Sequence, residues 1–524
     1  MWIFLKISCK KGGYQLAKFV KKRYTIRYIM TIKYERGMRS MQKEMLLESE
    51  EMIAERERKQ YEKMTKTPIP KLVISLGIPT MLSMLVTSLY NLADTYFVSL
   101  IGEDAVTAAV SNLLALMSII QAIGFTYGMG SGSIVSRLLG KRDREGADRI
   151  ASSAFAIGAV SGLVIMIIGF IFLKPILWLC GSRSDLVMGY SIEYAIFVLL
   201  SAPIMCMSFV MNNVLRAEGK AVLSMIGLII GAVVNVVLDP LFIFGLNLGI
   251  MGAALATCIS QFISFCVLLS MFVFHRSIVR IRLSSVARTF KPYWEIIETG
   301  FPSFCRQVLA SICSIFINSA AYEYGGDPAQ ASLGIVNKVF MFAFSVSLGI
   351  GQGYQPVLGY NYSSKHFDRV RSAYLFTLLF STGIMSLFGI VCGIFAPFLM
   401  QMFSLSSQAT EIGELTLRLQ CLTMPLLPTN FMVGLTYQVV GDKRLAALLS
   451  ASRQGLFYIP AVLLLPRLWG IFGVQSCQAI SDFFSFFFAI PFTIMFFNTL
   501  KREKEKCAQG EEGNTQEWQE PYLE

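Results

Sequence analysis

The sequence predicts an all-α polytopic membrane protein: twelve transmembrane helices in two six-helix lobes, related by a pseudo-two-fold axis along the membrane normal. Three observations predict this fold. The 524 residues are 54% hydrophobic and only 15% charged, whereas a soluble protein of this size has a more strongly charged surface. Apolar runs of about 20 residues recur, each long enough to cross a bilayer. Three glycine motifs of the first half also recur, in the same order, in the second half.

Charged and glycine-containing breaks define the twelve spans. The predicted spans are residues 70–98, 106–133, 150–173, 190–214, 222–246, 250–274, 296–321, 331–358, 372–396, 412–437, 444–465 and 471–497. They imply four regions: a basic, cytoplasmic extension at 1–66, an N-lobe at 67–285, a C-lobe at 286–500 and a charged cytoplasmic tail at 501–524.

Basic residues fall on alternate loops between these spans. The basic loops carry Arg137, Lys141, Arg142, Arg144, Arg149, Arg216, Lys220, Arg276, Arg280, Arg282, Arg288, Lys291, Lys365, Arg369, Arg371, Lys443, Arg444 and Arg453. The intervening loops carry little more than Lys174, Arg183, Arg418 and Arg467. By the positive-inside rule, this alternation predicts a multi-pass protein of the cell membrane with an even number of spans and both termini in the cytoplasm.

The repeated motifs indicate an internal duplication. "GIP" at Gly77–Pro79 matches "GFP" at Gly300–Pro302, and "GMG" at Gly128–Gly130 matches "GQG" at Gly351–Gly353, both at an offset of 223 residues. "GIMG" at Gly249–Gly252 matches "GIFG" at Gly470–Gly473 at an offset of 221. Because each half holds six spans, both halves start on the same side of the membrane, an arrangement common in transporters. A substrate cavity between the halves, open to each side in turn, follows as a hypothesis.

The net charge of +12 does not indicate a nucleic-acid partner, because the first forty residues hold eleven basic residues against the single Glu35. This arm could lie on anionic membrane lipid. The simpler interpretation, which we prefer, is an upstream extension of the reading frame, with synthesis starting at Met41 or Met64. No signal peptide is evident. The eleven cysteines form no CxxC pair, so we expect no disulfide framework, no structural metal site and no cofactor.

Acidic residues inside membrane spans are rare and indicate function by default. Asp94 lies in "YNLADTYFV", Asp239 in "NVVLDPLFIFG", and Asp482 near the start of the twelfth span. Counting 1.5 Å per residue places Asp94, Asp239 and Thr257 in the outer half of the first lobe, where they could share a pocket. Asn235 lies four residues before Asp239, and Asn91 three before Asp94, so each pair projects from one helix face.

This group predicts a cation-coupling site. Pro240 has no N–H, which leaves the carbonyl of Val236 without its usual helical partner and gives the helix a place to bend. Carboxylates, amide oxygens, a hydroxyl and a spare carbonyl suit Na⁺, or a proton shared between carboxylates. The alternative is structural, because a buried aspartate often only bonds a neighbouring helix. For Asp482 the two interpretations are evenly balanced.

Other polar residues are candidates for lining a cavity. Gln352 and Gln355 fit either a cavity wall or hydrogen bonds between helices. Arg306, ten residues into the seventh span, could pair with a carboxylate, hold an anionic substrate, or snorkel to the cytoplasmic interface. We favour snorkelling, because that span starts inside. The glycine run at residues 128–132 lacks the Lys-Ser/Thr of a phosphate loop and predicts close helix packing.

The sequence resembles the multidrug and toxic compound extrusion (MATE) family, and within it the bacterial MepA-like branch. The stretches that carry the resemblance are "SLYNLADTYFV", "GMGSGSIVSRLLGKRDREGADR", "LRAEGK", "NVVLDPLFIFGLNLGIMGAALAT" and "GIGQGYQPVLGYNYSSK". It covers roughly Ile69 to Asn498, all twelve predicted spans. The basic first forty residues are foreign to the family pattern.

The resemblance implies a V-shaped pair of lobes that exports organic compounds, often lipophilic cations, in exchange for Na⁺ or H⁺. The family's first-lobe cation site matches Asp94, Asn235, Asp239 and Thr257. Some branches also use acidic residues deep in the second lobe, but spans seven, eight and ten show none here at mid-membrane depth. We expect a small organic molecule as substrate, membrane lipid as surroundings, and a monomer.

Two other functions are alternatives to this one. A lipid-linked saccharide flippase of the wider superfamily should line its cavity with cationic residues, for which Arg216, Lys220 and Arg306 are the candidates. An intramembrane enzyme is disfavoured, because "LADTY" and "VLDPL" fit no aspartyl protease pattern and neither HExxH nor a nucleotide-binding loop is present. The sequence does not choose between Na⁺ and H⁺, nor name the substrate.

Overall fold

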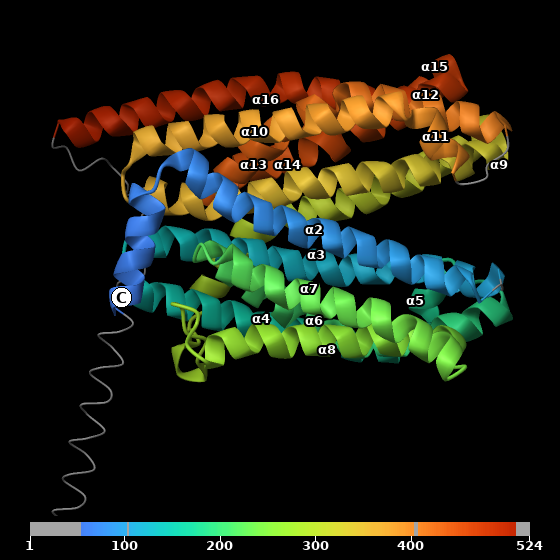
Figure 1. Cartoon of the computed structure of the whole chain (residues 1–524), viewed down its shortest axis with the longest axis horizontal. Helices are drawn as coiled ribbons and strands as arrows, with labels where there is room; N and C mark the ends of the chain where they lie inside the picture. The colour runs from blue at the N-terminus through green and yellow to red at the C-terminus, as the bar shows by residue number, and fades with distance from the viewer. Residues whose placement is uncertain (1–53, 102–103, 403–406, 510–524) are drawn as a thin grey trace, which may run out of the picture. The chain divides into compact units, whose positions relative to one another are not determined.

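The computed structural model describes residues 54–101, 104–402 and 407–509, and the regular structure in these residues is helical. Residues 1–53 of the predicted extension and 510–524 of the predicted tail lie outside them. A compact unit begins at Tyr61 and holds all the predicted spans. Its long helices run side by side along one direction (Figure 1).

The N-lobe contains the first six spans. They are α2 (Ile69–Ser99), α3 (Asp104–Gly140), α4 (Arg144–Ile171), α6 (Asp185–Ala217), α7 (Ala221–Pro240), which a π-helical segment η2 (Leu241–Gly245) continues, and α8 (Gly249–Val273). A linker with a 3₁₀ turn, η3 (Leu283–Ser285), leads to the C-lobe.

The C-lobe contains the other six. α9 (Lys291–Ser363) holds two spans, because Gly326 (φ 64°, ψ −161°) breaks it into residues 291–325 and 327–363. The next spans are α10 (Phe367–Ile394), then α12 (Ser407–Thr423) joined to α13 (Leu427–Val440) by η4 (Met424–Leu426), then α14 (Lys443–Ala451), η5 (Ser452–Tyr458) and α15 (Ile459–Trp469), and last α16 (Ile471–Ala508).

Twelve spans are therefore present in the described residues, as predicted. Ten helical segments are long and apolar enough to cross a membrane; dividing α9 gives eleven, and the joined pair α12 and α13 gives twelve. The boundaries differ by a few residues, and α16 continues past the predicted end of the C-lobe to Ala508.

The duplication extends to details that the sequence did not reveal. The short helices α5 (Leu173–Leu179) and α11 (Ala396–Gln401) follow the third span of each half, and their first residues are 223 positions apart, the offset of the glycine motifs. A π-helical segment also interrupts the fifth span of each half, η2 in the N-lobe and η5 in the C-lobe.

The lobes meet mainly where α2 and α3 pack against α9. We call the end of the helices that carries Lys141, Arg142 and Lys443 the basic end. The described hydrogen bonds between the lobes lie in the part of the interface that runs from this end to the Ser88–Ser345 contact, which is 2.7 Å long. Glycines permit the close approach: a Cβ on Gly130 would collide with the carbonyl of Ile296, and one on Gly300 with the carbonyl of Thr126. This confirms the prediction of close packing at the glycine run.

Buried polar residues join the lobes, among them the two glutamines for which the sequence left a cavity wall and hydrogen bonds between helices equally open. Gln355 Nε2 donates to Ser133 Oγ at 3.1 Å, and Gln352 accepts from Arg216; both glutamines are buried. In this conformation the two glutamines form hydrogen bonds between helices rather than part of a cavity wall.

Glu295 at the start of α9 pairs with Arg137 of α3 at 3.6 Å, and both side chains are largely buried. The described hydrogen bonds between the lobes, from Ser88–Ser345 through Thr80–Gly349 to Gln355–Ser133, therefore lie in the middle of the spans and toward the basic end.

Candidate functional site

A polar cluster lies inside the N-lobe, where α2, α7 and α8 meet. Asn235 and Asp239 sit one turn apart on α7, and both are fully buried. Asn235 Nδ2 donates to Asp239 Oδ1 at 3.2 Å and approaches Thr257 Oγ1 of α8 at 3.4 Å. Asp94 of α2 lies close enough to Asp239 for the two charges to affect each other. The structure thus brings together the four residues that the sequence singled out.

The cluster contains more hydrogen-bond acceptors than donors. Asp94 Oδ1, Asn235 Oδ1 and Asp239 Oδ2 are buried and have no hydrogen-bond partner in the described part of the chain. Buried polar atoms are nearly always paired, so three unpaired oxygens in one place call for an explanation. A cation or a proton would satisfy them, because a carboxylate and an amide oxygen are ligands of hard cations.

The backbone changes at this site. α7 ends at Pro240, directly after Asp239, and the chain continues as the π-helical segment η2. Pro240 has no N–H and cannot donate to the carbonyl of Val236. In the π-helical turn the hydrogen bonds span five residues instead of four, so the helix can continue past the missing bond. Such π-helical turns occur frequently at functional sites.

A cavity adjoins the cluster, and helices α2, α3, α6, α7 and α8 all contribute to its wall. Asn235 belongs to both the cluster and the cavity wall, so it connects the two. Asn91, a candidate from the sequence for lining a cavity, belongs to its wall. Arg216 is the charged residue of this wall.

Two residues at the site were missed from the sequence. Gln261 lines the cavity and lies four residues after Thr257, so the helical spacing of α8 carried a signal for it. Tyr194 of α6 is fully buried and lies beside Thr257 and both aspartates. It lies on α6, which carries none of the other residues of the cluster, so no spacing rule links it to them.

The comparisons with known proteins agree with this arrangement. The MatE family model matches residues 79–241 and 302–464, one match in each lobe, separated by the 223 residues of the internal repeat. The chain belongs to the MatE family.

Curated relatives of this MatE protein are multidrug exporters. The chain is 27% identical over 421 residues to the multidrug export protein MepA of Staphylococcus saprophyticus, which covers 80% of this chain and 92% of that protein. The MepA of Staphylococcus haemolyticus is 27% identical over 84% of this chain and 96% of its own length. A solved MATE family multidrug resistance transporter of the MOP superfamily, in an outward-facing conformation, matches with a TM-score of 0.80 and 26% identity, covering 84% of this chain and 98% of that one.

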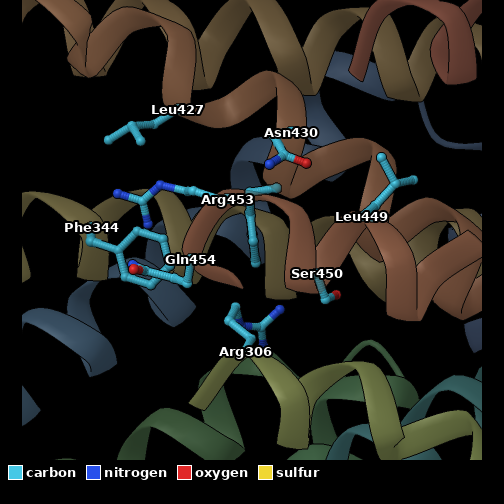
Figure 2. Close-up of a pocket in the computed structure, with 10 residues that line it drawn as sticks. Arg306, Phe344, Leu427, Asn430, Leu449, Ser450, Arg453 and Gln454 are labelled. Carbon is cyan, nitrogen blue, oxygen red and sulfur yellow. The ribbon is translucent and has the colours of Figure 1, made fainter. Parts of the chain in front are cut away.

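The C-lobe of this MatE protein has a polar site of its own, which we call the C-lobe pocket. It is lined by residues of α9, α13, α14 and η5, including Arg306 and Arg453 (Figure 2). Arg453, counted among the loop residues from the sequence, is instead only 12% exposed and donates from Nε to Asp482 Oδ1 at 2.7 Å. Gln478 Nε2 donates to the same oxygen at 2.9 Å. Asp482 is therefore the partner of a buried arginine.

Arg306 does not snorkel to the helix end. Its guanidinium carbon lies 5.3 Å from the centre of the Phe431 ring, inside the C-lobe pocket. Arg306 is 15 residues beyond Lys291, the first residue of α9, which corresponds to ~22 Å along the helix. Packing against Phe431 holds it at that depth, because a cation is attracted to the face of an aromatic ring.

Proposed function

We propose that the protein is a secondary antiporter that exports organic compounds, often lipophilic cations, in exchange for Na⁺ or H⁺. The observation that carries this proposal is the set of unpaired oxygens on Asp94, Asn235 and Asp239, buried beside a cavity that the same α7 helix lines. The multidrug export proteins among the relatives support the same substrate class.

The coupling ion and the organic substrate would compete through Asn235. When the cluster holds an ion, the amide and both carboxylates turn their oxygens toward it. When the ion leaves, two carboxylates close together in a low dielectric repel each other, so the charged empty state is unfavourable. A cationic substrate in the adjoining cavity offsets that charge, and a returning ion or proton displaces it. The coupling ion and the substrate are therefore exchanged for each other, because the same carboxylates offset the cost of removing either cation from water.

The helix geometry supports a way for the exchange of ion and substrate at the cluster to move the lobes. The break at Pro240 separates α7 from η2, so a change of charge at Asp239 can bend the helix there. Contacts at the basic end would then open as the other end closes. We place the basic end in the cytoplasm, with both termini on that side of the cell membrane, because positively charged loops stay inside. The N-lobe (67–285) and the C-lobe (286–500) are the two moving bodies of a monomer.

Efflux of a fluorescent lipophilic cation from proteoliposomes tests the proposal. Wild type is compared with Asp239→Asn and with Asp185→Asn, a control at the exposed start of α6. Inward Na⁺ and proton gradients are imposed separately. We expect one gradient to drive efflux in wild type and in the control, while Asp239→Asn still binds the dye but does not couple its efflux to the gradient. Normal transport by Asp239→Asn would make Asp239 structural and refute the coupling role.

One observation favours a second candidate, a lipid-linked saccharide flippase. Arg216 places a cationic group in the wall of the N-lobe cavity, where a pyrophosphate headgroup would need it. Its Nη1 already donates to Gln352, which argues for a role in joining the lobes. If wild type moves no organic cation under either gradient, transfer of a fluorescent pyrophosphate-linked lipid across the same vesicles becomes the deciding assay.

A further inference from the structure

The exchange described above does not use the C-lobe pocket. This pocket is smaller than the N-lobe cavity, so it suits one substituent of a compound better than the whole compound. Both halves of α9 and the π-helical segment η5 contribute to its wall (Figure 2). It therefore combines a concave shape with irregular backbone at the interior of the lobe.

The charges around this pocket do not balance. Its charged lining residues are Arg306 and Arg453, and the ion pair with Asp482 neutralises only Arg453. Arg306 makes neither a hydrogen bond nor an ion pair with any residue in the described ranges. One positive charge is left over at a depth where a charged side chain normally has a partner. A single negative charge would complete the site.

The ring contacts leave the guanidinium edges available. Arg306 lies over Phe431, and the guanidinium carbon of Arg453 is 5.1 Å from the centre of the Phe340 ring. The N–H donors of a guanidinium lie in its plane, so stacking a ring on its face leaves the edge free to hold a carboxylate with two parallel bonds. Figure 2 shows the guanidinium of Arg306 directed into the pocket on the side of Ser450.

Other unpaired polar atoms in the C-lobe pocket indicate which further groups a ligand would carry. Arg453 Nη2 is buried without a hydrogen-bond acceptor among the described residues, so it can donate to an acceptor group elsewhere on the same ligand. The side-chain oxygens of Asn430 and Gln454 are buried and equally unpaired, and they line the same pocket. They would accept from an N–H or O–H group next to the carboxylate.

We propose that the C-lobe pocket binds the carboxylate of organic substrates, with Arg306 as the anchor. This inference rests on the proposed export function and widens its substrates from lipophilic cations to compounds that also carry a carboxylate. A monocarboxylate, rather than a phosphate, matches the single excess positive charge.

Tetramethylrhodamine and its methyl ester test the inference, because the two dyes differ only in the free carboxylate. Binding of each to purified full-length protein in detergent is measured by fluorescence polarisation for wild type, Arg306→Gln, Arg306→Lys and Arg467→Gln. Arg467 is an exposed arginine of the same lobe and serves as the control. We expect Arg306→Gln to weaken the free acid about tenfold or more, since hydrogen bonds to charged groups contribute that much. The ester should change less than about twofold, and Arg306→Lys should recover part of the loss.

Binding of the ester also shows that each variant is folded. Equal weakening of acid and ester in Arg306→Gln would make Arg306 structural and overturn the inference, as would unchanged binding of both. Efflux of the ester from proteoliposomes separates the two proposals. If wild type exports neither dye, the export function fails; if it exports the ester and Arg306→Gln leaves acid binding intact, only the carboxylate site fails.

Discussion

The hydroxyl of Thr80 in the first span donates a 2.6 Å hydrogen bond to the carbonyl of Gly349 in the eighth, directly across the contact between the lobes. A side-chain donor reaches a backbone acceptor in the other lobe only if the helices nearly touch. Gly349 and Gly353 make this possible, since each faces backbone atoms of α2 without an intervening side chain.

Gly353→Ala should therefore shift the protein toward the state that is open at the basic end. A Cβ there would lie 2.5 Å from the Cα of Gly77 and 2.6 Å from its nitrogen, and backbone atoms cannot move aside as a flexible side chain can. We expect faster hydrogen exchange in residues 127–140 and 349–363, measured by mass spectrometry. Gly383→Ala is the control, because its Cβ would meet nothing within 4 Å. Identical exchange in the two variants would rule out the lobe contact as the controlling element.

The coupling ion should stabilise the folded protein through the N-lobe cluster. A ligand that binds only the folded state adds about 2.7 kcal/mol at a hundredfold excess over its Kd. We expect the unfolding temperature in detergent to rise either with Na⁺ at constant ionic strength or with falling pH, and Asp239→Asn to lose that response. Asp185→Asn should keep it. If Asp239→Asn responds to both titrations as wild type does, the ion binds elsewhere.

The Arg453–Asp482 pair should matter for stability because it is buried. Asp482→Asn leaves the cation of Arg453 without its partner, and breaking a buried pair by removing one member costs about 3–5 kcal/mol. Replacing both, as Arg453→Met with Asp482→Leu, should recover much of this loss. The matched control is Glu414→Gln in the more exposed Arg418–Glu414 pair, where a change below about 1 kcal/mol is expected. Denaturant unfolding in mild detergent measures all four proteins, and a double variant as unstable as Asp482→Asn would contradict the ion-pair explanation.

The "LRAEGK" stretch predicts a further effect. Glu218 is fully buried and accepts hydrogen bonds from the backbone N–H groups of Ile278 and Val279, at 2.9 and 3.1 Å, while pairing with Lys220 at 3.1 Å. It thereby fixes the start of the linker between the lobes. Glu218→Gln should destabilise the protein by about 1.5–3 kcal/mol and speed amide exchange at Ile278 and Val279.

The control for Glu218 is Glu145→Gln, an exposed carboxylate in the first turn of α4. A linker that exchanges at the wild-type rate in Glu218→Gln would show that other contacts hold it in place.

The sequence was sufficient for the features that follow from periodicity. The lengths of the apolar runs predicted the twelve spans. Helical spacing predicted that Asn235 and Asp239 lie on one face, and in the structure they are hydrogen-bonded to each other. Depth counting also placed Thr257 of a different helix at the same level, because rise per residue is nearly constant in a straight span.

Features that depend on how helices pack could not be obtained this way. Arg453 lies near two basic loop residues in sequence, so it was assigned to the loop, but η5 carries it into the lobe toward Asp482. Gln352 and Gln355 look equally suitable for a cavity and for a helix interface, and only the facing Arg216 and Ser133 decide between them. The π-helical turn after Pro240 likewise could not be predicted, since a proline alone is compatible with a kink of several kinds.

That turn gives the last prediction. In Pro240→Ala the new N–H can donate to the carbonyl of Val236, which favours a regular α-helix through the site and removes a residue that costs about 3 kcal/mol in a helix interior. We expect a higher unfolding temperature together with a severalfold slower gradient-driven efflux, because the helix loses its place to bend while the oxygens of the cluster stay. Pro491→Ala, a proline inside α16 far along the chain from the cluster, should gain stability without slowing transport. Undiminished efflux in Pro240→Ala would mean that α7 moves as a rigid rod and that coupling passes to the lobes by another route.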